Sequence, residues 1–205
     1  MDVVCLDLEG VLVPEIWIAF AEKTGIDALR ATTRDIPDYD VLMTQRLAHL
    51  ADNGLRLDDI QSVIASLTPL PGAAEFLADL RTAYQVIILS DTFYEFSKPL
   101  MAQLAWPTIF CHRLVVDGAG QVTGYQLRQK DPKRKSVQAL KQLNYRVFAA
   151  GDSYNDTTML EEADAGFLFS APANVIAEFP QYQATNSYTE LRRLIDAAAR
   201  THLAN

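Results

Sequence analysis

The sequence predicts an α/β protein with a doubly wound, mostly parallel sheet and a small helical insertion after the first strand. Three observations lead to this prediction. Short apolar runs alternate with helical patterns over most of the 205-residue chain, one segment near the start shows helical patterns alone, and polar clusters follow several apolar runs. Such alternation is typical of βαβ units, in which helices cover both faces of a parallel sheet. With 49% hydrophobic residues, the chain can bury a full core.

The first part of the chain predicts one strand and then a block of helices. Residues 3–6 form a β-rich apolar run that ends at Asp-Leu-Glu-Gly, which indicates a buried strand followed by a polar loop. Helical periodicity then marks residues 16–22, 39–51 and 58–66, and Asp58 is expected to cap the last of these helices.

Prolines mark where the helical block leaves and rejoins the rest of the chain. Pro14 precedes the block, and Pro69 and Pro71 follow it. We therefore expect a core domain made of residues 1–13 and 70–205, and a helical cap domain made of residues 14–69.

After Pro71-Gly72 strands and helices alternate, apart from one β-hairpin around Asp117-Gly-Ala-Gly120. A capping box that begins at Ser187 opens the last helix, which runs to about residue 200. The expected helices are 73–81, 94–104, 132–143 and 155–163, the expected strands are 85–89, 108–111, 146–150 and 166–169, and the hairpin spans 114–127.

Composition restricts the partners. A net charge of −8 and a pI near 4.8 argue against general binding to nucleic acid or to an anionic membrane, because both need a cationic face. Two cysteines are too few for a disulfide framework, and neither a signal peptide nor a membrane-length apolar run is recognisable, so we expect a cytoplasmic protein. Three histidines, His49, His112 and His202, lack metal-ligand spacing and are expected at packing or surface positions.

Polar residues follow the predicted strands at the edge where ligands bind in doubly wound sheets. They are Asp7 and Glu9, then Ser90-Asp91-Thr92, then Lys133 at a helix start, and finally Asp152 to Asp156. Carboxylates that converge on one crevice repel each other unless a cation neutralises them, and oxygen ligands favour Mg²⁺. One aspartate, Asp7, is placed to act as a phosphoryl nucleophile, while Lys133 and Ser90 can hold phosphate oxygens.

These motifs, taken in order, resemble those of the haloacid dehalogenase superfamily. The first motif of that family reads here Asp7-Leu-Glu9-Gly-Val11, the hydroxyl of the second is Ser90, the lysine of the third is Lys133, and the acidic pair of the fourth is Asp152 and Asp156. The resemblance implies a Rossmann-like core with a small cap, a phosphoryl-aspartate on Asp7, and Mg²⁺ bound by Asp7, Glu9, Asp152 and Asp156.

Within the superfamily the chain is similar to phosphoserine phosphatases, and in particular to bacterial ones that also transfer the phosphoryl group to homoserine. That resemblance implies that Glu15 and Arg46 hold the substrate ammonium and carboxylate, and that Asn155 helps to bind phosphate. Asp91 replaces a glycine that is common there, and we hypothesise that it orients an amino-acid acceptor.

Glu9 stands where the superfamily usually has a second aspartate. That residue protonates the leaving alcohol and later deprotonates water, and the extra methylene of glutamate displaces the carboxyl group. The sequence therefore leaves several readings open: hydrolysis of phosphoserine, transfer to homoserine, action on another small phosphomonoester, or a phospho-ligand binder with weak turnover. A homodimer is also left open.

Overall fold

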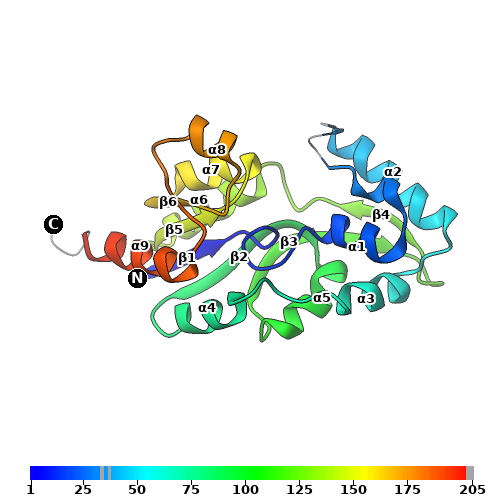
Figure 1. The fold of residues 1–205 in the computed structure, drawn as a ribbon, viewed down its shortest axis with the longest axis horizontal. Coiled ribbons are helices and arrows are strands. Elements are labelled where there is room, and N and C mark those ends of the chain that lie inside the picture. Colours follow the sequence, from blue (N-terminus) through cyan, green and yellow to red (C-terminus); the bar gives the residue numbers. More distant parts are fainter. Residues whose placement is uncertain (33–34, 37, 202–205) are drawn as a thin grey trace.

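The computed structural model describes residues 1–32, 35–36 and 38–201, and it contains a seven-stranded sheet flanked by helices (Figure 1). The strand order is β4-β3-β2-β1-β5-β6-β7, and all neighbours pair in parallel except β4 with β3. The strands are β1 (Asp2–Leu6), β2 (Gln85–Phe93), β3 (Thr108–Val116), β4 (Val122–Gln126), β5 (Arg146–Gly151), β6 (Ala165–Phe169) and β7 (Gln183–Thr185). The predicted α/β class and mostly parallel sheet are confirmed.

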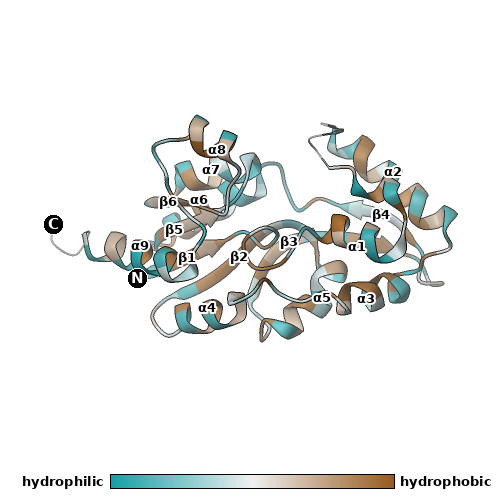
Figure 2. Ribbon diagram, viewed as in Figure 1, coloured by the Kyte–Doolittle hydropathy of each residue, from teal (hydrophilic) through white to brown (hydrophobic). Residues whose placement is uncertain are grey.

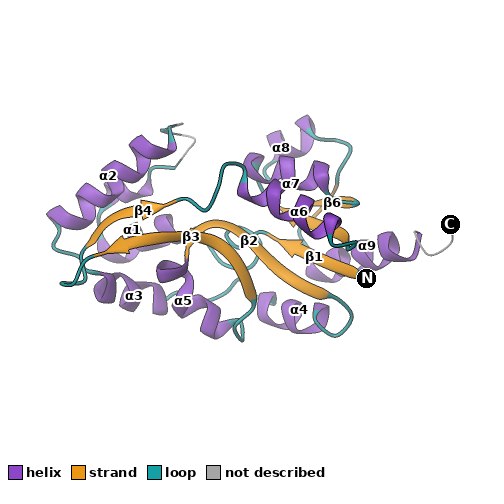
Figure 3. Ribbon diagram, turned by 180° about the vertical axis from the view of Figure 1, so that it is seen from behind, coloured by secondary structure: helices purple, strands orange, loops and turns teal. Residues whose placement is uncertain are grey.

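Helices α1, α2 and α3 follow β1 as a block, whereas the later helices alternate with strands. The helices are α1 (Ile16–Thr24), α2 (Tyr39–Asp52), α3 (Leu57–Ala65), α4 (Ala73–Leu80), α5 (Tyr94–Gln103), α6 (Pro132–Gln142), α7 (Thr157–Glu162), α8 (Ala173–Glu178) and α9 (Tyr188–Thr201), with short 3₁₀ turns η1 (Asp27–Arg30) and η2 (Tyr154–Asp156). Seen from behind, the sheet runs lengthwise through the molecule, with α4 and α5 on one side and α6, α7 and α8 on the other (Figure 3).

The central strand shows how the sheet is buried on both faces. Val4 and Leu6 belong to the hydrophobic cluster that includes side chains of α4, α5 and α9, whereas Val3 and Cys5 belong to the cluster that includes side chains of α6, α7 and α8. Successive side chains of a strand point to opposite faces, so a strand covered on both sides must be apolar throughout. The strands at the centre of the molecule are accordingly mainly hydrophobic (Figure 2).

The helical block and the sheet share one hydrophobic cluster. Trp17, Phe20 and Ile60 of the block share one hydrophobic cluster with Val4 and Leu6 of β1. The β3–β4 hairpin reaches the block as well, since the Leu57 N–H donates to the Gly120 carbonyl at 2.9 Å. The division into a core domain and a cap domain at residues 14–69 stays a prediction.

Two predicted strands are longer than expected. β2 continues to Phe93, so Ser90, Asp91 and Thr92 lie within the strand and not after it, and the pairing of β2 with β3 shifts register between Leu89 and Phe93. Such an irregularity lets polar residues face the edge of a site while the strand continues. β3 likewise runs on into the predicted hairpin as one strand to Val116.

Three other details differ from the prediction. Helix α3 begins at Leu57, and the Asp59 carboxylate accepts from the Arg56 N–H at 2.9 Å, so Asp58 is not its cap. The sequence pattern also missed α8 and the three-residue strand β7. At α9, Ser187 Oγ accepts from the Glu190 N–H at 3.4 Å, which is one half of the predicted capping box, but the Ser187 N–H donates to Thr185 Oγ1 and not to Glu190. In the described part of the chain, no helix combines the length and the apolar character needed to cross a bilayer.

Candidate active site

The connections of the sheet reverse direction next to β1. From β1 the chain builds β2, β3 and β4 on one side, and it then returns to build β5, β6 and β7 on the other. Crevices form beyond the carboxyl ends of the strands at such a reversal, because the flanking loops turn away from each other. Leu6 pairs with Ala150, and the Asp7 N–H donates to the Ala150 carbonyl at 3.0 Å, so the two loops that carry Asp7 and Asp152 begin side by side.

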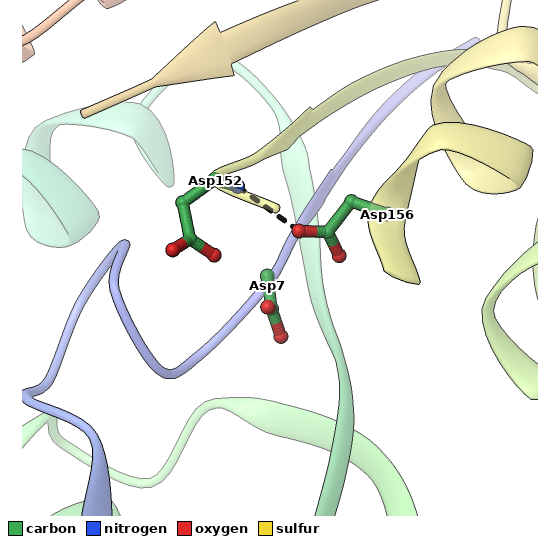
Figure 4. A group of neighbouring side chains, drawn as sticks. All are labelled: Asp7, Asp152 and Asp156. Carbon is green, nitrogen blue, oxygen red and sulfur yellow. Dashed lines mark hydrogen bonds between the residues drawn. The ribbon is translucent and has the colours of Figure 1, made fainter. Parts of the chain in front are cut away.

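Three carboxylates gather at this point (Figure 4). Asp7, Asp152 and Asp156 each offer an oxygen, and these oxygens all lie within 4.8 Å of one another. The side chains are buried, with residue exposures of 4%, 9% and 0%. Burial, followed by the charge of Asp156, raises the pKa of Asp7 well above its usual 3.8, and the same two effects raise the pKa of Asp152 to about 6.

Lys133 is the cation nearest to this cluster. It lies at the start of α6, where Pro132 occupies the first turn, and its residue is 3% exposed. Its Nζ lies 2.7 Å from Asp156 Oδ1, 3.0 Å from Asp7 Oδ1 and 3.7 Å from Asp91 Oδ2. Although burial alone would lower it, these three carboxylates raise the pKa of Lys133 well above its usual 10.5, so the side chain stays charged.

Asp156 has both carboxylate oxygens engaged. Oδ1 accepts from Lys133, and Oδ2 accepts from the N–H groups of Asp152 at 2.9 Å and Ser153 at 3.2 Å. A Cβ added to Gly151 would lie 2.3 Å from the Asp156 carboxyl carbon, so only glycine allows this approach. Asp156 therefore holds Lys133 and the loop after β5 in place.

The Glu9 carboxylate lies outside the three-carboxylate group. Its Oε2 accepts from the Ile16 N–H at 2.8 Å, which satisfies a free donor at the start of α1. Burial, and secondly the charge of Glu15, raise the pKa of Glu9 to about 8. Glu9 is therefore mainly protonated at neutral pH.

Asp91 reaches the cluster from β2 through Lys133, and Ser90 is its buried neighbour in the strand. Ser90 is buried, and its Oγ accepts from the Thr92 N–H at 3.2 Å. Asp91 accepts from Asn155 Nδ2 at 3.0 Å through Oδ2, and its Oδ1 lies 3.6 Å from His112 Nε2. Burial would raise the pKa of Asp91, but Lys133, His112 and Asn155 outweigh it and hold that pKa well below its usual range.

His112 is buried in β3, in line with a packing position, but it also contacts a site residue. Its Nδ1 accepts from the Arg128 N–H at 3.1 Å, so the other ring nitrogen, Nε2, carries the proton and faces Asp91. Sequence patterns could not predict this contact, because His112 and Asp91 lie on two different strands. His202 lies outside the described residues.

Arg46 reaches the crevice from α2. Its residue is 7% exposed, and the guanidinium lies over the Trp17 ring at 4.5 Å. Nη2 donates to the Ala31 carbonyl at 2.8 Å, but buried Nε has no partner among the described residues. Burial lowers the pKa of Arg46 while the charges of Glu9 and Glu15 oppose that effect, so all three groups lie within electrostatic reach. Glu15 is exposed at the start of α1.

The site has more negative charge than its lysine can balance. Lys133 contacts three carboxylates, yet the pKa values of Asp7 and Asp152 remain raised. A divalent cation beside Asp7 and Asp152 would relieve this repulsion, and an all-oxygen donor set suits Mg²⁺. Because both oxygens of Asp156 already accept hydrogen bonds, Asp7 and Asp152 are the carboxylates best placed to be direct ligands.

The sequence matches a known family and two phosphoserine phosphatases of Pseudomonas. Residues 1–164 match the haloacid dehalogenase-like hydrolase family. The chain is 70% identical to phosphoserine phosphatase ThrH of Pseudomonas aeruginosa over 193 residues, which cover 94% of each chain, and 68% identical to a phosphoserine phosphatase of Pseudomonas syringae over 94% of this chain and 81% of that protein.

Solved structures show the same fold at low sequence identity. A phospho-aspartyl intermediate analogue of phosphoserine phosphatase has a TM-score of 0.76 at 19% identity, covering 94% of this chain and 98% of that one, and a substrate-bound phosphoserine phosphatase complex has a TM-score of 0.74 at 19% identity, covering 96% and 97%. From the match over most of its length and its close relatives, the chain belongs to the haloacid dehalogenase-like hydrolase family.

Proposed function

We propose that this hydrolase is a Mg²⁺-dependent phosphoserine phosphatase that passes through a phosphoryl-aspartate on Asp7. One observation carries the proposal: buried, charged Lys133 lies 3.0 Å from Asp7 beside the Asp7–Asp152–Asp156 cluster. An aspartate held between a fixed ammonium and a candidate cation site is suited to attack a phosphate, because both positive charges offset the repulsion between two anions. The names of two close relatives support phosphoserine as the substrate.

In the first step an Asp7 carboxylate oxygen bonds to phosphorus while the bond from phosphorus to the serine oxygen breaks. Lys133 and the Ser90 hydroxyl hold the phosphoryl oxygens, and Asn155 supports them from the loop after β5. Glu9, which is protonated at neutral pH, gives its proton to the leaving serine oxygen. Bound Mg²⁺ would supply a charge that stabilises the phosphoryl group between Asp7 and Asp152.

In the second step the ionised Glu9 takes a proton from water, the water oxygen bonds to phosphorus, and the bond between Asp7 and phosphorus breaks. The helical block of residues 14–69 acts as a cap over this chemistry and limits the entry of bulk water. Glu15 and Arg46, both on the cap side, bind the ammonium and the carboxylate of the substrate.

An alcohol can replace water in the second step, and we propose homoserine as that acceptor. Its hydroxyl would give its proton to Glu9, just as water does, and the product would be phosphohomoserine. Asp91 is anionic and fixed by Asn155 and Lys133, so it can orient the acceptor. An Asp91→Ala variant should shift the ratio of phosphohomoserine to free phosphate. An unchanged ratio would mean that Asp91 does not orient the acceptor.

The experiment is phosphate release from phosphoserine by the wild type, with Mg²⁺ or EDTA and with or without homoserine. Acid-quenched protein is digested, and the peptide that contains Asp7 is examined by mass spectrometry for a phosphoryl group. Asp7→Asn should lose both phosphate release and the phosphopeptide, while Asp58→Asn, a change at an exposed position of α3, keeps both. If the wild type bound phosphoserine without hydrolysing it, the protein would be a phosphoserine-binding protein and not a phosphatase. Activity that persists in EDTA would contradict the proposed dependence on Mg²⁺.

A further inference from the structure

The Tyr39 hydroxyl and Nε of Arg46 lie on one face of α2, and neither has a hydrogen-bond partner in the part of the chain that the structure describes. Tyr39 and Arg46 are seven residues apart, which is about two helical turns and places both on the same side. The guanidinium of Arg46 is fixed by Trp17 and Ala31, but its Nε is buried and has no partner among the described residues. A buried unpaired donor costs free energy, so it indicates a missing acceptor.

The Tyr39 phenol lies in the same space. Its side chain is partly buried, and its ring edge packs on Tyr125 of β4 with the centroids 5.9 Å apart, which fixes its direction. The charges of Asp91, Arg46 and Glu9 all act on the phenol, and these residues come from β2, from α2 and from the loop after β1. Tyr125 in turn packs on Phe93 at the end of β2, with the centroids 6.2 Å apart, so the phenol lies near the strand end that carries Asp91.

The phenol is a hydrogen-bond donor at neutral pH. Burial, and then the charge of Asp91, raise the pKa of Tyr39 above its usual 10. No other residue in the described ranges accepts a hydrogen bond from its hydroxyl, whereas the neighbouring Tyr125 hydroxyl donates to Asp40. A protonated phenol beside an arginine is suited to an anion, and the proposed phosphate site already has Lys133 as its cation.

We propose that Tyr39 is a specificity-determining residue: its hydroxyl, together with Nε of Arg46, binds the carboxylate of the amino-acid substrate. This inference rests on the proposed phosphoserine activity and adds a second donor on the cap side. Phosphate monoesters that lack the carboxylate would leave both donors unpaired, so the enzyme would discriminate against them.

The test compares phosphoserine with phosphoethanolamine, which keeps the phosphate and the ammonium but lacks the carboxylate. For wild type, Tyr39→Phe and Tyr125→Phe, kcat/KM is measured with both substrates, and the inhibition constant of L-serine is measured with each enzyme. Tyr125→Phe is the matched control, because it removes a hydroxyl from the ring that packs on Tyr39.

In Tyr39→Phe the ratio of kcat/KM for phosphoserine to that for phosphoethanolamine should fall about tenfold, as expected for the loss of one hydrogen bond to a charged group. The inhibition constant of L-serine should rise by a similar factor, and both quantities should keep their wild-type values in Tyr125→Phe. If kcat/KM fell equally with both substrates in Tyr39→Phe, the tyrosine would have only a packing role. That result would overturn this inference but would not affect the proposed phosphatase function. A wild type inactive on phosphoserine would overturn both proposals together.

Discussion

The Lys133 ammonium lies 2.7 Å from Oδ1 of Asp156, and neither side chain reaches solvent, since their exposures are 3% and 0%. Lysine is a flexible point charge, so a buried partner is needed to keep it at one position. The backbone N–H groups of Asp152 and Ser153 hold the other oxygen of Asp156. The position of the phosphate-binding ammonium thus depends on a residue that we do not expect to touch the substrate.

Replacing Asp156 with asparagine should therefore destabilise the protein as well as inactivate it. Asparagine can accept from the Asp152 and Ser153 N–H groups only with its amide nitrogen toward Lys133, which loses a charge-assisted hydrogen bond worth about 1.5–3 kcal/mol. We expect the free energy of unfolding to fall by about that amount in urea titrations. Asp27→Asn is the control, since the Asp27 side chain is 89% exposed and solvent screens its ion pair with Arg30. Equal losses in the two variants would contradict the structural role of Asp156.

Glu9 combines two functions that substitutions can separate. Glu9→Gln keeps an oxygen that can accept from the Ile16 N–H, but it cannot donate or take up the catalytic proton. We expect kcat for phosphoserine to fall about 10²–10⁴-fold while the free energy of unfolding changes by less than about 1 kcal/mol.

Glu9→Ala loses both functions, so it should be inactive and also less stable, since α1 then has an unpaired donor at its start. The measurements are initial rates with phosphoserine and urea unfolding. If Glu9→Gln kept wild-type kcat, another group would be the acid and base.

The sequence could predict which residues approach each other at the strand ends. Asp7 and Asp152 follow β1 and β5, and adjacent parallel strands end at the same edge, so the topology alone brings the two carboxylates together. The position of Lys133 near these carboxylates could be predicted in the same way, because α6 leads into β5 and the first turn of α6 lies near that edge. Their chemical roles remain predictions.

Contacts between distant segments could not be predicted. Whether Ser90 and Asp91 lie in a strand or after it depends on the register shift between β2 and β3, which local periodicity does not encode. The position of Tyr39 depends on how α2 packs on β4, and that packing brings together residues about 85 positions apart. Short elements such as β7 were missed because three residues show no period.

Without metal, stability should fall as the pH rises from about 4.5 to 8. Asp152 and Glu9 have folded-state pKa values raised to about 6 and about 8, whereas the unfolded chain keeps usual values near 4. The folded protein binds more protons than the unfolded chain in this range, so stability present at low pH is lost as these groups ionise. The shift of Asp152 alone corresponds to about 2 kcal/mol or more. The measurement is urea unfolding in EDTA across this range.

Mg²⁺ should reverse most of that loss, because it binds the ionised folded form. Asp152→Asn in EDTA should also show a flatter dependence on pH than the wild type. A metal-free wild type whose stability stayed constant from pH 4.5 to 8 would show that burial and neighbouring charges do not raise the pKa values of Asp152 and Glu9.

Gly151→Ala should disrupt the site although it replaces no charged residue. The new Cβ would lie 2.3 Å from the Asp156 carboxyl carbon, and Asp156 can move away only by breaking its hydrogen bonds with Lys133 and two backbone N–H groups. Overpacking of this kind costs about 1–3 kcal/mol. We expect a fall of that size in the free energy of unfolding and a loss of phosphoserine turnover, since Lys133 moves with Asp156. Gly118→Ala is the matched control, as a Cβ there meets nothing within 4 Å. Normal turnover by Gly151→Ala would mean that the arrangement of Asp156 and Lys133 tolerates displacement and is not what positions the phosphate.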